Sequence, residues 1–221
     1  MPWPEHTIHF VDFEGSVSSG ILEYGIVTLR AGKIEATATR LCRATGRVRA
    51  EDAAVHGLDE ATVARAAPFT DEFERFARLR ETGPMAAHFA NAENTMLKSV
   101  WAYPRAVPDF VRPDRTVTDW GPWVDTGRLL PQLYPALESA KLEDVVRAFE
   151  LQAELDAGAA EHCPDDRRHY HAALYDALAG ALLLRRLAHE SAVATQSLGW
   201  LLQMSTLDPG KRSALMQDEL F

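Results

Sequence analysis

The sequence has few cysteines, and this scarcity rules out one common way of stabilising a chain. Cys42 and Cys163 are the two present, too few for the disulfide framework of a small secreted protein. No apolar run approaches the roughly 20 residues that a bilayer crossing needs. The opening residues MPWPEHTIHF have neither a basic leader nor a long apolar segment. We therefore expect a cytoplasmic protein with no membrane partner.

Positive charge is also scarce. The chain has 23 Lys and Arg residues against 32 Asp and Glu residues, which gives a formal net charge of -9. Proteins that bind nucleic acid through a broad basic surface make many Lys and Arg contacts with phosphate. The composition of this chain argues against that class of protein. Nucleic acid is not excluded as a substrate, because bound divalent metal ions reverse the local charge of an acidic site.

Internal repeats and low-complexity segments are absent too. The 221 residues, 47% of them hydrophobic, suit one globular domain. We predict that this domain covers residues 1–204. Residues 205–221 have turn-forming residues before a short apolar end, which is typical of a flexible C-terminal tail.

The first third of the chain is typical of a sheet, and the remainder of alternating helices and strands. Three strand-like segments, 7–15, 20–29 and 33–41, are separated by turn-forming clusters and predict an antiparallel meander. The later periodicities predict helices over 50–66, 69–81, 91–103, 126–133, 142–151, 171–190 and 192–205, strands over 84–90 and 123–125, and loops over 104–122 and 161–169. Asn91 is the expected cap of its helix. This order predicts an α/β fold with a mixed sheet flanked by helices.

Two acids lie within the first predicted strand, in the segment IHFVDFEG. Successive residues of a strand alternate faces, so Asp12 and Glu14 point the same way, while Val11 and Phe13 face the opposite side. Two unpaired carboxylates in an apolar setting cost roughly several kcal/mol. Because hard cations such as Mg²⁺ prefer carboxylate oxygens and waters, these acids indicate a metal site that acids from other segments would complete.

Three segments that carry acids and histidines resemble, in the same order, the motifs of the DEDDh branch of the DnaQ-like exonucleases. They are VDFEG with Asp12 and Glu14, AAHFANAENTML with His88 and Glu93, and HAALYDA with His171 and Asp176. The segments ILEYGIV and VHGLDE also look like family sequences, and the likeness spans about Thr7 to Ala188. The resemblance implies a ribonuclease-H-like fold, with three antiparallel strands followed by parallel ones.

The resemblance also implies a function and its residues. It implies a metal-dependent 3′–5′ exonuclease that hydrolyses phosphodiester bonds at the 3′ end of single-stranded nucleic acid, DNA above RNA, and releases nucleoside 5′-monophosphates. Two Mg²⁺ ions, for which Mn²⁺ substitutes, are the implied cofactors. The implied metal ligands are Asp12, Glu14, Glu93 and Asp176, the implied general base is His171, and the implied substrate contacts are Gly15, Ser16, His56 and His88.

The spacing of His171 and Asp176 restricts where the histidine lies. Five residues along a continuous helix turn through about 500°, which leaves the two side chains about 140° apart. We therefore expect His171 in the loop or first turn before the helix. An imidazole with an ordinary pKa of about 6.5 is suited to accept a proton from water near neutral pH.

The second motif departs from the family pattern, since Glu93 stands where the family has Asp. Glu keeps the carboxylate but is one methylene longer, so one interpretation is that it binds a metal directly or through water. The alternative is a weakened second metal site. Two alternatives to a DNA exonuclease therefore stay open. They are an exoribonuclease and a catalytically weakened relative that binds nucleic-acid ends.

The last five residues, QDELF, resemble the peptide with which polymerases and repair enzymes bind the bacterial sliding clamp. Leu220 and Phe221 would fill an apolar pocket while Gln217 forms a hydrogen bond at its rim. The alternative is a tail that folds back onto its own domain.

Overall fold

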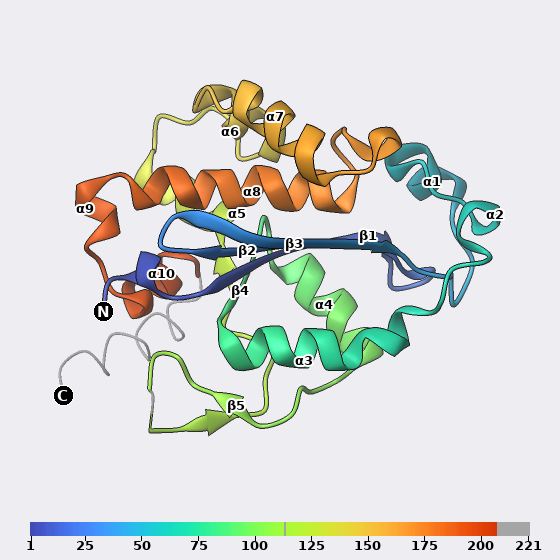
Figure 1. Ribbon diagram of the computed structural model, residues 1–221, viewed down its shortest axis with the longest axis horizontal. Coiled ribbons are helices and arrows are strands. Elements are labelled where there is room, and N and C mark those ends of the chain that lie inside the picture. The colour runs from blue at the N-terminus through green and yellow to red at the C-terminus, as the bar shows by residue number, and fades with distance from the viewer. Residues whose placement is uncertain (113, 207–221) are drawn as a thin grey trace.

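A five-stranded mixed sheet forms the centre of the computed structural model, which describes residues 1–112 and 114–206 (Figure 1). The strand order is β3-β2-β1-β4-β7. The expected antiparallel meander is confirmed, and β4 and β7 run parallel to β1. The strands are β1 (Ile8–Ser16), β2 (Gly20–Arg30), β3 (Lys33–Leu41), β4 (Met85–Ala87) and β7 (Val124–Asp125).

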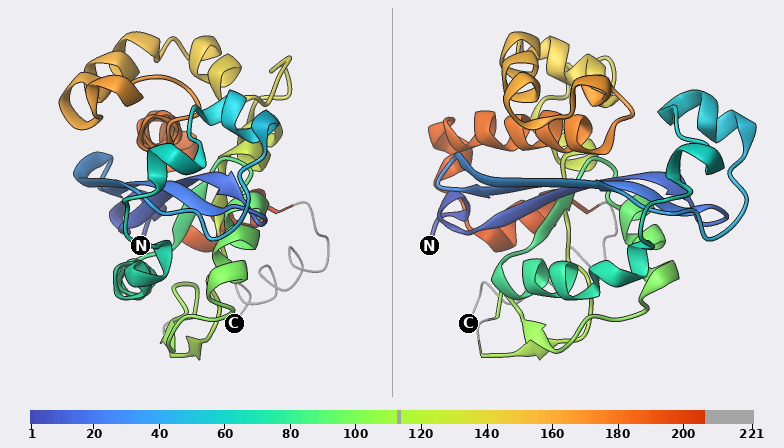
Figure 2. Two further views of the ribbon diagram at one scale, coloured as in Figure 1. Left: turned by 90° about the vertical axis from the view of Figure 1, so that its right-hand side faces the viewer. Right: turned by 45° about the vertical axis from the view of Figure 1, so that its right-hand side comes forward.

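Helices cover both faces of this sheet (Figures 1 and 2). On one face lies α8 (Ala173–Ala188), with α6 (Leu142–Ala148) and α7 (Gln152–His162) packed outside it. On the other face lie α3 (Phe73–Thr82) and α4 (Asn91–Val100). The side chains of β1 alternate between the two faces of the sheet and contribute to the core on each face. Ile8 and Phe10 belong to the core beneath α8, and Val11 and Phe13 belong to the core on the α3 side.

The remaining elements connect these layers. They are η1 (Trp3–Glu5), α1 (Ala50–His56), α2 (Glu60–Val63), η2 (Phe69–Glu72), β5 (Val107–Pro108), β6 (Thr116–Val117), α5 (Thr126–Leu133), η3 (Asp165–Arg167), α9 (Ser191–Ala194) and α10 (Leu198–Met204). No helix among the described residues has the length and apolar character to span a bilayer.

Small residues let α8 lie directly on the sheet. A Cβ added at Gly180 would lie 2.0 Å from Cζ of Phe10, and one added at Gly25 would lie 2.1 Å from the carbonyl oxygen of Ala173. Gly25 pairs with Asp12 across the β1–β2 ladder. The absence of a side chain at Gly25 therefore brings the first turn of α8 next to the acidic end of β1.

The structure corrects several sequence predictions. Helix α7 was not expected, because its apolar residues show no clear single face along QAELDAGAAEH. The predicted loop 104–122 contains the short β5–β6 hairpin, and the predicted last helix is divided into α9 and α10 by a turn. The predicted strand 84–90 has three residues in the sheet, and Asn91 is the first residue of α4, not its cap.

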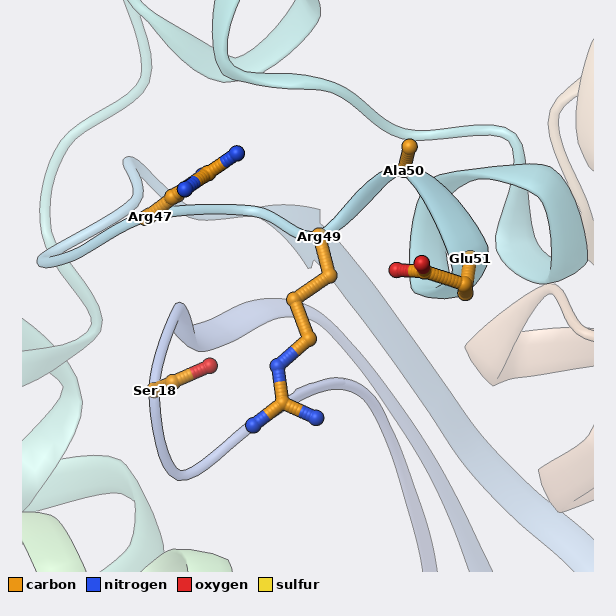
Figure 3. A pocket seen from close by; sticks show the side chains of 5 residues that line it. All are labelled: Ser18, Arg47, Arg49, Ala50 and Glu51. Carbon is orange, nitrogen blue, oxygen red and sulfur yellow. The ribbon is translucent and has the colours of Figure 1, made fainter.

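The segment between β3 and α1 lies on the turn that joins β1 to β2 (Figure 3). The Thr45 N–H donates to the Ser19 carbonyl oxygen at 2.9 Å. A Cβ at Gly46 would lie 2.2 Å from the Ser18 carbonyl oxygen, so only glycine allows this close approach. The contact fixes the β3–α1 segment against the end of β1.

The first residues of the chain join its last described helices. The Trp3 N–H donates to the Gln196 carbonyl oxygen and its indole N–H to the Val193 carbonyl oxygen, both at 2.9 Å. Pro2 also forms a β-bridge with Ser197. The residues of the clamp hypothesis, Gln217, Leu220 and Phe221, lie outside the described residues, so that hypothesis and the boundary at residue 204 stay predictions.

Adding one methyl group tests the close packing of α8. We expect Gly180→Ala to lower the free energy of unfolding by about 1–3 kcal/mol, because its Cβ would overlap the Phe10 ring. Gly158→Ala in α7 is the matched control. Nothing lies within 4 Å of its added Cβ, and Ala replaces Gly in a helix, so we expect a gain of about 0.5–1 kcal/mol. Urea unfolding measures both, and equal stability of the Gly180 variant and the wild type would contradict the packing.

Candidate metal and active site

The candidate site lies where three parallel strands end. Because β1, β4 and β7 run in the same direction, their carboxyl ends share one edge of the sheet. This edge carries Asp12 and Glu14 on β1, Glu93 on the helix after β4, and Asp125 at the end of β7. The sequence therefore places four acids in one region, two from β1 and one from each of the strand–helix units β4–α4 and β7–α5.

Asp176 and His171 approach this region from α8. Helix α8 begins at Ala173, so His171 lies in the turn before it, as the spacing predicted. The His171 N–H donates to Asp176 Oδ2 at 3.0 Å, and His171 has a left-handed backbone with φ of 63°. A non-glycine residue in this conformation is held there by its surroundings. The histidine side chain is exposed.

Glu14, His171 and Asp176 form a group of possible metal ligands. One ligand atom from each lies within 4.8 Å of the others. Glu14 and Asp176 are buried, whereas His171 is exposed, so the group opens to solvent on the histidine side. Asp12 and Glu93 are not members of this tight group among the described residues. The carboxylates of Asp12, Glu14, Glu93 and Asp176 are nevertheless close enough for their charges to repel.

Burial, with a smaller contribution from neighbouring acids, raises the pKa of all four carboxyl groups. The pKa of Asp12 lies well above its ordinary value, chiefly because the carboxyl is desolvated and then because Asp176 and Glu14 repel its charge. Burial first, and then Asp176, raises the pKa of Glu14 to about 8. Burial likewise raises the pKa of Glu93 to about 8 and that of Asp176 to about 7. In the absence of a cation, the site therefore favours protonated carboxyl groups.

Two of these carboxyl groups contain a buried oxygen with no hydrogen-bond partner. They are Oε2 of Glu93 and Oδ1 of Asp176. Buried polar atoms are satisfied in nearly all folded proteins, so an unpartnered oxygen in an acidic cluster indicates that something else completes it. Carboxylate oxygens and waters are the ligands that Mg²⁺ and Mn²⁺ prefer. The residues present therefore fit a divalent metal site.

Asp125 organises the loop that leads to Glu93, and the sequence analysis missed it. Its two carboxylate oxygens accept hydrogen bonds from the N–H groups of Phe89, Ala90 and Arg128, at 3.0, 3.1 and 3.2 Å. Asp125 thus caps α5. It also holds the residues just before α4, where the sequence analysis expected Asn91 to act as the cap. The sequence signal was present, because Asp directly before the predicted helix from Thr126 is a common N-cap.

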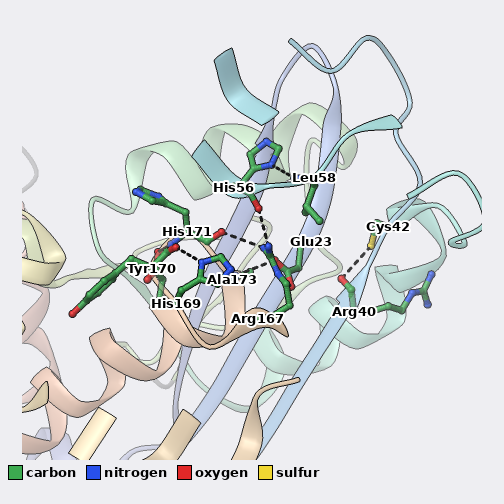
Figure 4. Close-up of polar contacts among 11 residues, drawn as sticks. Glu23, Arg40, Cys42, His56, Leu58, Arg167, His169, Tyr170, His171 and Ala173 are labelled. Atoms are coloured by element: carbon green, nitrogen blue, oxygen red, sulfur yellow. Dashed lines mark hydrogen bonds and ion pairs between the residues drawn. The ribbon is translucent and has the colours of Figure 1, made fainter. Parts of the chain in front are cut away.

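A buried ion pair between Glu23 and Arg167 holds the His171 turn (Figure 4). The Arg167 Nε–H donates to Glu23 Oε1 at 3.2 Å, and its Nη2 donates to the carbonyl oxygen of His171 at 3.1 Å. Glu23 Oε2 accepts from the Ala173 N–H at 3.1 Å. Since Glu23 pairs with Glu14 across β1 and β2, the ion pair connects the acidic strand to the turn. Arg167 is buried, which corrects the predicted solvated loop.

His56 lies on the other side of the same arginine. The Arg167 Nη1 donates to the His56 carbonyl oxygen at 2.7 Å, and Nδ1 of His56 accepts from the Leu58 N–H at 3.1 Å. Nδ1 is therefore unprotonated, and burial lowers the pKa of the ring. Nε2 is buried and has no partner. His56 thus has an unused but buried N–H, and its predicted substrate contact stays a prediction.

The other predicted substrate contacts have roles within the fold. The His88 ring nitrogens lie 3.0 Å from Thr126 Oγ1 and 2.7 Å from the Ala140 carbonyl oxygen. A Cβ at Gly15 would lie 2.3 Å from the Gly20 carbonyl oxygen, so the hairpin itself requires glycine there. The Ser16 N–H donates to Ser19 Oγ at 2.9 Å. The substrate contacts of these three residues stay predictions.

The fold is shared with solved exonuclease structures. The chain is similar to Exonuclease X in complex with 5′-overhanging duplex DNA, with a TM-score of 0.64 and 20% identity over 90% of this chain and 99% of that one. It is similar to the nuclease domain of 3′hExo, a DEDDh family member bound to rAMP, with a TM-score of 0.58 and 15% identity over 87% and 96%. It also resembles E. coli Exonuclease I in complex with a dT13 oligonucleotide, with a TM-score of 0.61 and 11% identity over 85% of this chain and 42% of that longer one.

These likenesses confirm the expected ribonuclease-H-like fold, with the mixed sheet and flanking helices of the DEDDh exonucleases. Neither a protein-family model nor a curated protein matches the chain.

The raised carboxyl pKa values make the stability of the metal-free protein depend on pH. The pKa of Glu14 rises from 4.5 to about 8 on folding, so its stabilising contribution is full below about pH 4.5 and is lost as the pH rises through about 8. Without divalent metal we expect the Tm to fall across this window, and Glu14→Gln to flatten the fall. Mg²⁺ or Mn²⁺ binds the deprotonated carboxylates and should raise the Tm more near pH 8 than near pH 6. Thermal scans measure both effects, and an undiminished metal-induced rise in Glu14→Gln would contradict the site.

Proposed function

We propose that this chain is a metal-dependent 3′–5′ exonuclease that hydrolyses the terminal phosphodiester bond of single-stranded nucleic acid. The observation that carries the proposal is the acidic group at the end of β1. Buried Glu14 and Asp176 share this group with exposed His171, and unpartnered carboxylate oxygens lie within the wider cluster. An acidic group of this kind attracts cations and repels the nucleic-acid backbone, so the proposed substrate binds where cations have neutralised it.

The proposed cofactors are two divalent ions, Mg²⁺ or in its place Mn²⁺. Asp12, Glu14 and Asp176 would hold one ion, and Asp12 with Glu93 the other. Such a pair of ions would supply activation of the attacking water and stabilisation of the leaving oxygen. Glu93 reaches the region from the first turn of α4 and has its unpartnered Oε2 buried there. This geometry supports a ligand role for Glu93.

His171 is the proposed general base. Its side chain is exposed beside Glu14 and Asp176, while its backbone is held by Asp176 on the N–H side and by Arg167 on the carbonyl side. A base restrained at both peptide groups keeps its ring near the attacking water. The ring accepts the water proton, the new bond forms at phosphorus, and the 3′ oxygen of the preceding nucleotide leaves. The product is a nucleoside 5′-monophosphate.

The proposed substrate is DNA, with RNA as the rival. Solved structures of the shared fold include a complex with 5′-overhanging duplex DNA and one described as recognising the 3′ end of a histone mRNA stem-loop, so the fold accepts either polymer. Gly15, Ser16, His56 and His88 are the proposed substrate contacts. A cytoplasmic location and clamp binding through Gln217, Leu220 and Phe221 are further parts of the proposal.

Removing a central carboxylate should abolish hydrolysis without unfolding the protein. We expect Asp12→Ala and Asp176→Ala to lower the rate on a 3′-labelled single strand by at least about 1,000-fold, because each removes a metal ligand. Their metal-free Tm should hold or rise, since each also relieves carboxylate repulsion. A gel assay with Mg²⁺ or Mn²⁺ measures the rate, with Asp71→Ala, an exposed acid on η2, as the control. Turnover retained in either site variant would refute the assignment.

Glu93→Asp tests whether the site is built around the longer side chain. The start of α4 is held by Asp125 at Phe89 and Ala90, so the helix cannot move freely toward a shorter carboxylate. We therefore expect the rate to fall by about 10–100-fold, the usual range for disturbing a metal site. The same gel assay measures it. A rate equal to or above that of the wild type would show that a family-like Asp is fully compatible with this helix position.

A further inference from the structure

Three arginines lie close together on the segment between β3 and α1. Arg43, Arg47 and Arg49 are exposed, and within the part of the chain that the structure describes none of their side chains forms an ion pair or hydrogen bond. Some exposed arginines elsewhere, such as Arg75 and Arg105, pair with carboxylates, whereas others, such as Arg65 and Arg78, form no ion pair among the described residues. In a chain with 32 acids against 23 bases, unpaired arginines in one short segment indicate an anion from outside the protein.

Two of these arginines line a pocket of about 420 Å³. Its other lining residues are Ser18, Ala50 and Glu51 (Figure 3). Arg47 and Arg49 are two positions apart on this segment, and their side chains point in different directions, with Arg47 directed away from the Ser18 turn. Arg49 points toward the turn that carries the Ser18 hydroxyl. The pocket has no aromatic or large apolar lining, so it offers charge and hydrogen bonds but no surface on which a base would stack.

The pocket is fixed relative to the acidic site. The β3–α1 segment is hydrogen-bonded to the β1–β2 turn through Thr45 and Ser19, and Gly46 lies in contact with Ser18. That turn directly follows Gly15 and Ser16, the residues after Glu14 on β1. The pocket is therefore held in a fixed position relative to the end of β1 that carries Glu14.

We propose that Arg47 and Arg49, with the Ser18 hydroxyl, bind backbone phosphates of the nucleic acid upstream of the 3′ end held at the acidic site. This inference rests on the proposed function. Guanidinium groups form forked, charge-assisted hydrogen bonds with phosphate oxygens, and such contacts are independent of base sequence. This subsite would let a protein of net negative charge bind the nucleic-acid backbone through a local group of positive charges. Glu51 on the same rim weakens that hold, which suits a strand that must advance after each cleavage.

Direct binding of a nucleic acid tests the subsite separately from hydrolysis. The probe is a fluorescein-labelled single strand whose last linkages are phosphorothioates, measured by anisotropy with the full chain and Mg²⁺. We expect the double variant Arg47→Gln/Arg49→Gln to raise the Kd at least about 10-fold and to reduce the slope of log Kd against log salt by about 1.4, which is 0.7 for each lost contact. Glu51→Gln should lower the Kd.

Arg30→Gln is the matched control, because Arg30 is exposed at the opposite end of β2 and the same charge change there should leave the Kd within about twofold. The p-nitrophenyl ester of thymidine 5′-monophosphate is a second control, since it lacks upstream phosphates and its turnover should not change in the double variant. A Kd or salt slope unchanged in the double variant, or changed equally by Arg30→Gln, would overturn the subsite. A wild type that binds the strand through these arginines but never shortens an ordinary one would overturn the proposed function and leave the subsite standing.

Discussion

The desolvation of a group of neighbouring carboxylates is the constraint on which the rest of the structure depends. Asp12, Glu14, Glu93 and Asp176 converge from β1, α4 and α8, and their pKa values are raised first by removal from water and then by neighbouring acids. Neighbouring acids would separate if their supports were loose, so each is carried by an element that cannot shift easily. Strand β1 is central in the sheet, and α8 is pressed onto it at Gly25 and Gly180. The packed core thus holds these acids close together, although their charges repel one another.

The supports of the site are themselves ionic and buried. Arg167 takes part in four contacts that bring together Glu23, the His56 carbonyl and the His171 carbonyl, so one guanidinium connects β2, the end of α1 and the turn before α8. A buried ion pair adds little net stability but is costly to break, which makes it a good device for fixing geometry. Asp125 acts in the same way on the other side, where it holds the loop before Glu93. The arrangement separates two tasks, since the crowded acids are free to bind cations while other charged residues hold them in position.

The sequence was sufficient to predict the features that depend on short local patterns of residues. The meander, the strand–helix units and the place of His171 before α8 follow from alternation, helical periodicity and a spacing of five residues. The same patterns could not reveal Arg167, because an arginine in a polar stretch reads as solvated until the fold brings Glu23 opposite it, 144 positions earlier in the chain. Asp125 was visible as a helix cap but not as the holder of α4, since its contacts with Phe89 and Ala90 exist only after β4 and β7 pair. Helix α7 was missed because it lacks a distinct apolar face. Long-range contacts account for the first two gaps, and the weak local pattern of α7 accounts for the third.

The join between Trp3 and the segment 193–197 has a consequence for the limits of the folding unit. The motifs begin on β1, and a truncation made at that strand would keep every proposed catalytic group. It would also remove the indole that fills the space beside Val193 and the backbone bonds that anchor α9 and α10. Leu198, Leu201 and Leu202 of α10 belong to the same core as Phe10 and Leu178. The segment needed for folding is therefore longer than the segment that carries the motifs. Residues near its start and near its described end bind each other and hold the two ends of this segment together.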